Sequence, residues 1–310
     1  MALPYRWQWR FERWKNAARS FFGAGNEQPR PKICPACGAL VGISATRCHE
    51  CGTSLRFSLV AVSKSLGGAI GGETPVTTLI LIVNLLLFGV SLVASNLATG
   101  GLNLFSGVSG RVLYQLGARQ SLAIKEGGEW WRLVMPMFLH GGLLHIAMNS
   151  LFLVDIGPQV ERIYGSARYL FIYVFTGVCS FLASTAWNLW TSQGFGVGIG
   201  ASGALAGLIG VMLGMTHGRG GIYAGEIRAQ MTRMVVYLFI MALLPIGIDN
   251  AAHFGGLAAG FLLGKFLADR EPMNAAEFKR AYALAWLAGI VVVASFAMMF
   301  LHFRDPLPGT

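Results

Sequence analysis

The sequence predicts an all-α polytopic membrane protein, because of its composition and its series of long apolar segments. Of its 310 residues, 54% are hydrophobic and only 12% are charged, which is about half the charged fraction of a typical soluble domain. The mean hydropathy of +0.56 indicates the same class. Four of the five cysteines lie within residues 1–74, whereas the chain after Pro75 is largely apolar. We therefore expect a small cysteine-bearing module followed by a membrane-embedded part.

Residues 1–32 form a basic aromatic arm. They contain seven Lys or Arg residues and no long apolar run, so we expect no cleavable signal peptide. Apolar residues recur in the arm at helical spacing, namely Trp7, Phe11, Trp14, Ala18 and Phe21. Two interpretations stay open: a helix that lies on an anionic membrane surface, or a loosely ordered basic arm.

Residues 33–57 contain two closely spaced cysteine pairs, which are Cys34, Cys37, Cys48 and Cys51. Four thiolates in two short turns match the tetrahedral ligand set of structural zinc, and Gly38 and Gly52 let backbone amides turn towards the sulfurs. We expect a zinc-ribbon-like module. Disulfides are the alternative and need an oxidising compartment, and His49 is an alternative ligand. Cys179 stands alone in an apolar run and is expected to be a packed core thiol.

A glycine-rich linker over 58–75 leads to the first of seven predicted membrane spans. This first span, 76–95, has close to the roughly 20 residues that a bilayer requires. Six further apolar segments follow, at 141–160, 169–190, 201–217, 231–248, 250–268 and 281–302. Residues 96–139 are too long and too mixed in composition for a simple turn, so we expect a folded loop at the membrane interface.

The distribution of Lys and Arg predicts a cytoplasmic N-terminus. Basic residues gather in alternate connections between the predicted spans, namely Arg162, Arg168, Arg219, Arg228, Arg233, Lys265, Arg270, Lys279 and Arg280. The first loop goes against this trend, since it carries Arg111, Arg119, Lys125 and Arg132. We ascribe the net charge of +10 to orientation in the lipid bilayer and expect no nucleic-acid partner. The expected location is the plasma (inner) membrane of a prokaryote, where a cytoplasmic module agrees with reduced cysteines.

Polar residues inside the predicted spans mark the candidate site, because such side chains are costly within a membrane. His145 and Asn149 lie four residues apart on one helix face, and His140 comes just before them. The fourth span begins at Gly200-Ala201-Ser202-Gly203, and the sixth carries His253. Both spans continue with glycines at intervals that let two helices pack closely, namely Gly203, Gly207, Gly210, Gly214, Gly256, Gly260 and Gly264.

If the fourth and sixth spans pack on these glycines, Ser202 and His253 come within hydrogen-bond reach as a nucleophile and its base. His145, Asn149 and backbone amides near Ser202 can then donate to a developing oxyanion. Asp249 is expected in the preceding loop, so the sequence predicts a dyad without an acidic third member. Each motif alone has a simpler explanation. Glycine-flanked serines and GxxxG stripes occur in packed membrane helices, and buried histidines can pair or line an ion path.

At these residues the sequence resembles the rhomboid family over about residues 76–270. The matching motifs occur in the family's order and are Trp131-Arg132, His140-x4-His145-x3-Asn149, Gly157-x3-Glu161-x3-Gly165, Gly200-Ala201-Ser202-Gly203 and His253-x2-Gly256-x3-Gly260. The resemblance implies a six-helix protease core, with residues 271–310 as an additional C-terminal transmembrane helix and tail. One departure is Ala206, where some members have an aromatic residue that stacks on the catalytic imidazole.

The resemblance also implies a role for each matching residue. Ser202 and His253 would form the catalytic dyad, with His145, Asn149 and the Ser202 amide as oxyanion donors. The other matching residues would support them: His140 next to the site, Trp131, Arg132 and Glu161 in organising the first loop, and the glycines of the motifs, Gly200, Gly203, Gly256 and Gly260.

The activity implied is that of an intramembrane serine endopeptidase that cleaves transmembrane protein substrates in or near their membrane span. No cofactor is expected for the catalysis, and structural zinc is expected only in the N-terminal module, where a cytoplasmic partner is a further expectation. A non-proteolytic rhomboid-like binding or quality-control factor is the alternative, although such proteins usually lack the serine or the histidine. A transporter or channel would favour carboxylates on the spans, which are almost absent.

Overall fold

The computed structural model describes residues 32–34, 38–42, 45–52, 54–55, 73–99, 107–192, 196–243, 247–267 and 269–303. The chain divides into two compact units, residues 1–58 and 59–310, and each is described by itself. Almost all of the arm expected over 1–32 lies outside the described residues, as do Cys37, most of the linker and the tail over 304–310.

In the first unit, strand β1 (Lys32–Ile33) pairs antiparallel with β2 (Leu40–Val41). Glycines follow two of the cysteine-bearing turns. Gly38 and Gly52 have φ values of 77° and 68°, in the region that favours glycine. Their amides donate to the carbonyls of Cys34 and Cys48, each over 2.9 Å. The glycines therefore allow tight turns in which their own amides donate to backbone carbonyls, and the expected amide contacts to the sulfurs stay a prediction.

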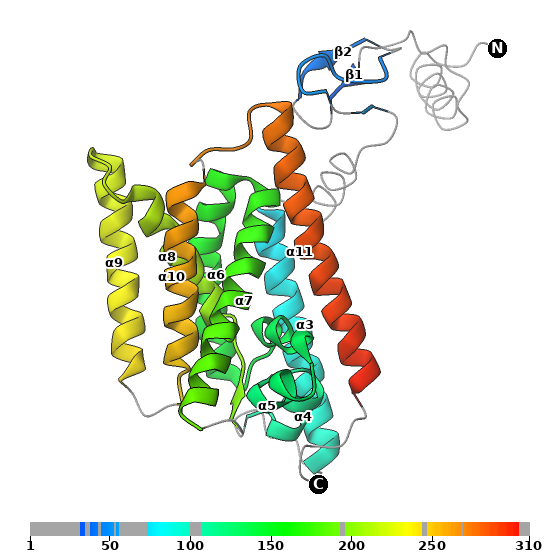
Figure 1. Ribbon diagram of the computed structural model, residues 1–310, viewed down its shortest axis with the longest axis vertical. Coiled ribbons are helices and arrows are strands. Elements are labelled where there is room, and N and C mark those ends of the chain that lie inside the picture. Colours follow the sequence, from blue (N-terminus) through cyan, green and yellow to red (C-terminus); the bar gives the residue numbers. More distant parts are fainter. Residues whose placement is uncertain are drawn as a thin grey trace, which may run out of the picture. The chain divides into compact units, whose positions relative to one another are not determined.

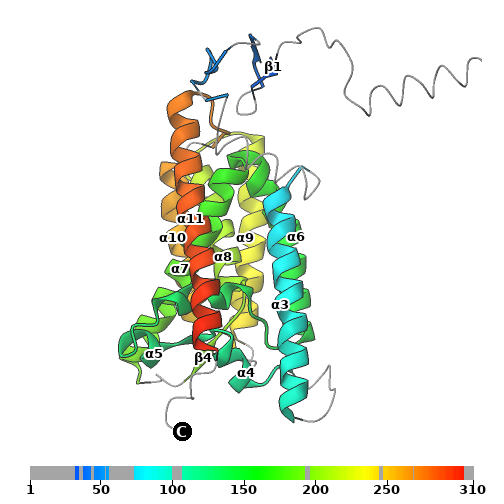
Figure 2. The same ribbon diagram turned by 90° about the vertical axis from the view of Figure 1, so that its right-hand side faces the viewer.

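The second unit is a bundle whose described residues form seven helices of 15 or more residues (Figures 1 and 2). They are α3 (Pro75–Thr99), α6 (Leu143–Tyr164), α7 (Ser166–Trp190), α8 (Ser202–Thr216), α9 (Ile222–Ala242), α10 (Asn250–Phe266) and α11 (Ala275–His302). Each helix overlaps one predicted apolar segment. α9 begins at Ile222 rather than 231, and α11 at Ala275 rather than 281. The prediction began each segment where the sequence becomes apolar, whereas the backbone hydrogen bonds of the helix also include the charged residues that come before it.

Four of these helices, α3, α6, α7 and α11, are long and apolar enough to cross a membrane. The apolar helix α8 has 15 residues and α10 has 17, which is fewer than the roughly 20 that a perpendicular span requires. α9 has 21 residues but is interrupted by charged side chains at Glu226, Arg228 and Arg233. The expected crossing of α8, α9 and α10 therefore stays a prediction.

Helix α8 lies in the interior of the bundle, with almost every residue buried. It packs most closely against α10 and also contacts α6, α7 and α9. A Cβ atom at Gly256 would overlap the backbone oxygen of Gly203, and one at Gly260 would overlap that of Gly207. The two helix backbones therefore touch along their glycines, and the close packing predicted from the GxxxG stripes is confirmed.

The first loop is folded, as expected. Its described part contains two short helices, one strand and two 3-10 helices, which are α4 (Gly110–Gln115), β3 (Arg119–Gln120), α5 (Ser121–Lys125), η1 (Trp130–Leu133) and η2 (Met135–Phe138). Strand β3 pairs antiparallel with β4 (Val197–Gly198), just before α8. The loop is therefore attached by backbone hydrogen bonds to the chain segment that leads to Ser202.

Arg132 lies in the interior of this loop and contacts several of its turns. Its side chain is buried and donates to the Glu129 carboxylate over 2.5 Å and to the Tyr114 and Ala118 carbonyls over 2.6 and 3.2 Å. The guanidinium also lies over the Trp131 ring, 4.5 Å from its centroid. One arginine thus satisfies groups from several turns of the loop.

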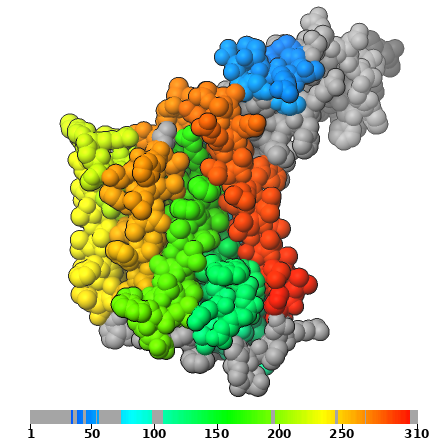
Figure 3. All heavy atoms as spheres, viewed as in Figure 1, coloured from blue at the N-terminus to red at the C-terminus, as the bar shows by residue number. Residues whose placement is uncertain are grey.

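The C-terminal helix α11 packs against α7 and the first loop (Figures 1 and 3). The Trp131 and His302 ring centroids lie 5.7 Å apart, and those of Phe138 and Phe296 are also 5.7 Å apart. The seventh helix therefore packs against the first loop as well as against the bundle.

Glu161 joins α6 to α3, and none of its hydrogen bonds with described residues goes to the first loop. Its buried carboxylate accepts hydrogen bonds from the Val76 and Thr77 amides, over 3.0 and 2.9 Å, and from the Thr77 and Ser166 hydroxyls, each over 2.7 Å. Glu161 lies in the last turn of α6, where it caps the N-terminus of α3. Unpaired amides and the helix dipole favour a carboxylate at that position.

Candidate active site

Strand β4, which pairs with β3 of the first loop, leads into α8, and α4 and α5 of that loop lie at one end of the bundle (Figure 1). Ser202 is the first residue of α8, and His253 lies in the first turn of α10. Since α8 and α10 pack backbone to backbone with their N-termini at the same end, the first turns of the two helices are neighbours. The two side chains predicted to meet therefore do meet.

The Ser202 hydroxyl oxygen lies 2.7 Å from Nε2 of His253, and both residues are half-buried. This separation suits direct transfer of the hydroxyl proton to the imidazole. For Nε2 to accept that proton, the neutral ring must carry its hydrogen on Nδ1. None of the described residues forms a hydrogen bond with Nδ1, so the arrangement is a pair without a third member.

Glycines shape the turn that presents Ser202. Gly200 has a φ of 116°, and its amide donates to the Pro136 carbonyl over 2.9 Å. This positive φ favours glycine. A Cβ at Gly203 would overlap the Ser180 side chain of α7. Gly200 thus permits the sharp entry into α8, and Gly203 permits the close approach of α7.

His145 faces the same space as Ser202. A Cβ built on Gly200 would lie 2.6 Å from Nε2 of His145 and 3.6 Å from the Ser202 hydroxyl oxygen, so Gly200 leaves room for the imidazole. The Gly141 amide donates to Nδ1 of His145 over 3.4 Å. The hydrogen of the neutral ring then lies on Nε2, which makes that nitrogen a donor near the Ser202 hydroxyl.

Asn149 and His140 both contact His145. The Asn149 side-chain nitrogen donates to the His145 carbonyl over 2.8 Å, and its oxygen has no partner among the described residues. His140 is fully buried, and its ring meets that of His145 edge-on at 5.2 Å. Burial lowers the pKa of His140 to about 3, and the neighbouring His145 contributes to this shift. Its ring is therefore neutral and limits where the His145 ring can lie.

The sequence analysis did not identify Arg119, Ser184 and Asp249 as members of one group. Asp249 caps α10, since its Oδ1 accepts from the Ala252 amide over 3.0 Å. Its Oδ2 accepts from Nη2 of Arg119 over 3.1 Å and from the Ser184 hydroxyl. Burial lowers the pKa of Arg119, and Asp249 opposes that shift. The one signal for this group in the sequence was Arg119, a basic residue on the predicted outer side of the membrane.

Ala206, the departure from some family members, is fully buried in α8. In the part of the chain that the structure describes, no aromatic ring stacks on the His253 imidazole. The ring is therefore positioned by its helix and by Ser202.

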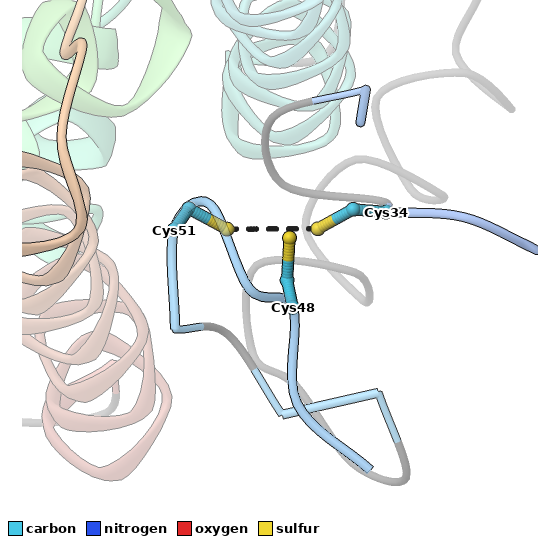
Figure 4. A group of neighbouring side chains, drawn as sticks. All are labelled: Cys34, Cys48 and Cys51. Atoms are coloured by element: carbon cyan, nitrogen blue, oxygen red, sulfur yellow. Dashed lines mark hydrogen bonds between the residues drawn. The ribbon is translucent and has the colours of Figure 1, made fainter. Parts of the chain in front are cut away.

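Three of the four predicted zinc ligands lie together in the first unit. The Cys34, Cys48 and Cys51 side chains are buried, and their sulfurs lie within 4.8 Å of one another (Figure 4). Cys34 and Cys51 are 3.6 Å apart, sulfur to sulfur, far beyond the roughly 2.05 Å of a disulfide. The observed separation is close to the roughly 3.8 Å between two thiolates bound to one tetrahedral zinc with 2.3 Å bonds. These three cysteines could hold a metal, whereas His49 is exposed and faces Glu50.

Comparison with known proteins gives a family assignment. Residues 127–270 match the family model described as the Rhomboid domain. The chain is 32% identical over 223 residues to RHOMBOID-like protein 6, mitochondrial, of Arabidopsis thaliana, covering 66% of this chain and 70% of that protein. It is 41% identical over 166 residues to RHOMBOID-like protein 5 of the same plant, covering 52% of each chain.

A bacterial relative is Rhomboid protease GluP of Bacillus subtilis, which is 32% identical over 191 residues, 62% of this chain and 35% of that protein. The match thus spans about half or less of two of these three relatives. The fold and the serine–histidine pair define an integral membrane protein of the serine-protease kind. The chain belongs to the rhomboid family of intramembrane proteases.

Proposed function

We propose that this protein is a serine endopeptidase that cleaves transmembrane proteins in or near their membrane span. The observation that carries the proposal is the 2.7 Å contact between the Ser202 hydroxyl and Nε2 of His253. A serine hydroxyl becomes a competent nucleophile when an adjacent imidazole removes its proton. Family membership supports this assignment, since the Bacillus relative is named as a protease.

The geometry supports a two-stage acyl transfer. His253 takes the Ser202 proton as the oxygen attacks the scissile carbonyl, and then donates it to the leaving amine. Water next attacks the acyl-enzyme, with His253 again as the base, and Ser202 is regenerated. Nε2 of His145, the Asn149 amide and the free amides of the first turn of α8 would donate to the oxyanion, where preorganised donors act most strongly.

Two single substitutions test this mechanism. Ser202→Ala and His253→Ala should each abolish cleavage of a reconstituted single-span substrate, and Ser202→Ala should also abolish labelling by a fluorophosphonate. His217→Ala, at the opposite end of α8, is the matched histidine control and should label at the parental rate. A folded parental protein that neither labels nor cleaves would instead favour a non-proteolytic binding or quality-control role.

We also propose the orientation that the basic residues predict, with the N-terminus in the cytoplasm of a prokaryotic cell and the protein in its plasma membrane. Ser202 and His253 then open towards the non-cytoplasmic side, from which water reaches the acyl-enzyme. The chain's basic residues support this orientation under the positive-inside rule.

For the first unit we propose a structural zinc site made by Cys34, Cys48, Cys51 and Cys37, the last of which lies outside the described residues. Three buried sulfurs within 4.8 Å of one another support it. Bound zinc would hold the two turns together in a module with little apolar core of its own. Such a module would serve as a docking site for a cytoplasmic partner.

A further inference from the structure

Asp249 connects the helix that carries His253 to two other elements. One carboxylate oxygen caps the first turn of α10 through the Ala252 amide, and the Asp249 carbonyl accepts from the His253 amide over 3.1 Å. The other carboxylate oxygen accepts from Arg119 of the first loop and Ser184 of α7. Asp249 thus uses both oxygens away from the imidazole, and it acts on the backbone that carries His253.

Arg119 connects the same carboxylate to the segment that leads to Ser202. Its Nη1 donates to the Ser121 hydroxyl over 2.9 Å and to the Gly196 carbonyl over 3.2 Å. In the β3–β4 pair Arg119 lies opposite Gly198, four residues before Ser202. A Cβ at Gly198 would lie 2.7 Å from Nε of Arg119, so this glycine lets the guanidinium lie against the strand.

The Arg119–Asp249 pair is shielded from solvent, with the Arg119 side chain 4% exposed and that of Asp249 22% exposed. A buried ion pair often adds little net stability compared with apolar residues, but removal of one partner leaves the other charge buried and uncompensated. The guanidinium is planar and can hold several acceptors in one fixed arrangement. One arginine here holds the β4 segment before Ser202 and the cap of the helix with His253.

We propose that Arg119 and Asp249 are positioning residues that set the separation of Ser202 and His253 by joining strand β4 to the N-terminus of α10. The inference rests on the proposed proteolytic function. Displacing a catalytic group by about 1 Å can lower a rate by about 10²-fold. Loss of the pair should therefore slow the chemical step more than it weakens substrate binding.

The test uses Asp249→Asn, Arg119→Met and Arg119→Lys in the full chain. Asparagine can still cap α10 with its one side-chain oxygen, whereas its side-chain nitrogen takes the place of Oδ2 and can only donate. Asp249→Asn therefore removes the charge and the bond from Arg119 with little change in shape. We expect Asp249→Asn and Arg119→Met to lower kcat and the rate of Ser202 labelling by about 10- to 100-fold, with KM changed less than about threefold. Arg119→Lys restores the charge and should label at an intermediate rate.

The matched control is a second Arg–Asp pair, Arg219 with Asp269, which lies at the other end of the bundle. Asp269→Asn should label at the parental rate. Thermal unfolding of every variant in detergent gives its folded fraction. Parental labelling by folded Asp249→Asn would overturn the inference, as would a loss no larger than its unfolded fraction. A parental protein that itself neither labels nor cleaves contradicts the proposed function instead.

Discussion

The two histidines near Ser202 carry their hydrogens in different places, and this difference separates their roles. Nε2 of His253 faces the Ser202 hydroxyl as an acceptor, whereas Nδ1 of His145 accepts from the Gly141 amide and so leaves a hydrogen on Nε2. A neutral imidazole has one donor and one acceptor nitrogen. The surroundings thus favour a base at His253 and an oxyanion donor at His145.

The first prediction concerns the proposed oxyanion donors. His145→Ala and Asn149→Ala should each lower kcat by about 10²–10³-fold, because each removes one of the proposed donors. Steady-state cleavage of a single-span substrate in liposomes measures the effect. Because these residues do not form the nucleophile, residual activity should exceed that of Ser202→Ala. A His145→Ala protein with parental kcat would exclude this role for His145.

At the scale of helices, the contact of α8 with α10 brings the site together. Ser202 and His253 each lie at the start of one of these helices, and the helix backbones touch along glycines. With no side chains between the helices, small changes in their spacing are transmitted directly to the two first turns. The glycine contact therefore sets how closely the two helices that carry Ser202 and His253 can pack.

The second prediction tests this contact. Gly260→Ala places a Cβ on the backbone oxygen of Gly207, and such overpacking costs about 1–3 kcal/mol. We expect a lower unfolding temperature in detergent and slower labelling of Ser202. The control is Gly289→Ala in α11, where no atom lies within 4 Å of the added Cβ. Its unfolding temperature should stay the same or rise, since alanine favours a helix. Equal behaviour of the two variants would contradict the packing argument.

At the scale of the whole molecule, half of the basic residues in the first loop have structural partners. Of its four basic residues, Arg119 and Arg132 are buried and paired with Asp249 and Glu129. The positive-inside rule concerns short connections near helix ends and applies less to folded segments. Arg119 and Arg132 therefore serve the folded structure of the loop, although they oppose the distribution of basic residues seen in the other connections.

The third prediction concerns this orientation. In whole cells, a single cysteine at Thr191 should react with a membrane-impermeant thiol reagent, whereas one at Gly220 should not. The two positions follow α7 and α8, at opposite ends of the bundle. The protein without an added cysteine gives the background, and permeabilised cells should label at Gly220. Labelling of Gly220 but not Thr191 in intact cells would reverse the topology.

The fourth prediction separates the two units. Replacing Cys48 and Cys51 with serine should remove about one zinc per chain, measured by metal analysis of the purified protein. Ser202 labelling should persist, because the residues of the candidate active site all come from the second unit. Cys179→Ser, a change to a thiol on α7, is the matched control and should keep the metal. Loss of Ser202 labelling together with the zinc would place the cysteine module within the protease fold.

The sequence by itself determined the class of protein, the seven helices, the folded first loop and the Ser202–His253 pair. These follow from local signals: apolar runs long enough for helices, glycines at helical spacing, and polar residues where lipid would penalise them. Helix ends were less well predicted, as α9 shows, because hydrogen bonding along the backbone continues past the apolar stretch that marks it.

Only the tertiary structure decided what Glu161, Arg119 and Asp249 do. Glu161 caps α3, whose first turn is more than 80 residues away in the chain, and Arg119 meets Asp249 across 130 residues. No periodicity records such a pairing, because a buried charge is stabilised by whichever partner the folded chain brings to it. The sequence shows that a charge lies within an apolar region, and only the three-dimensional arrangement shows which groups balance it.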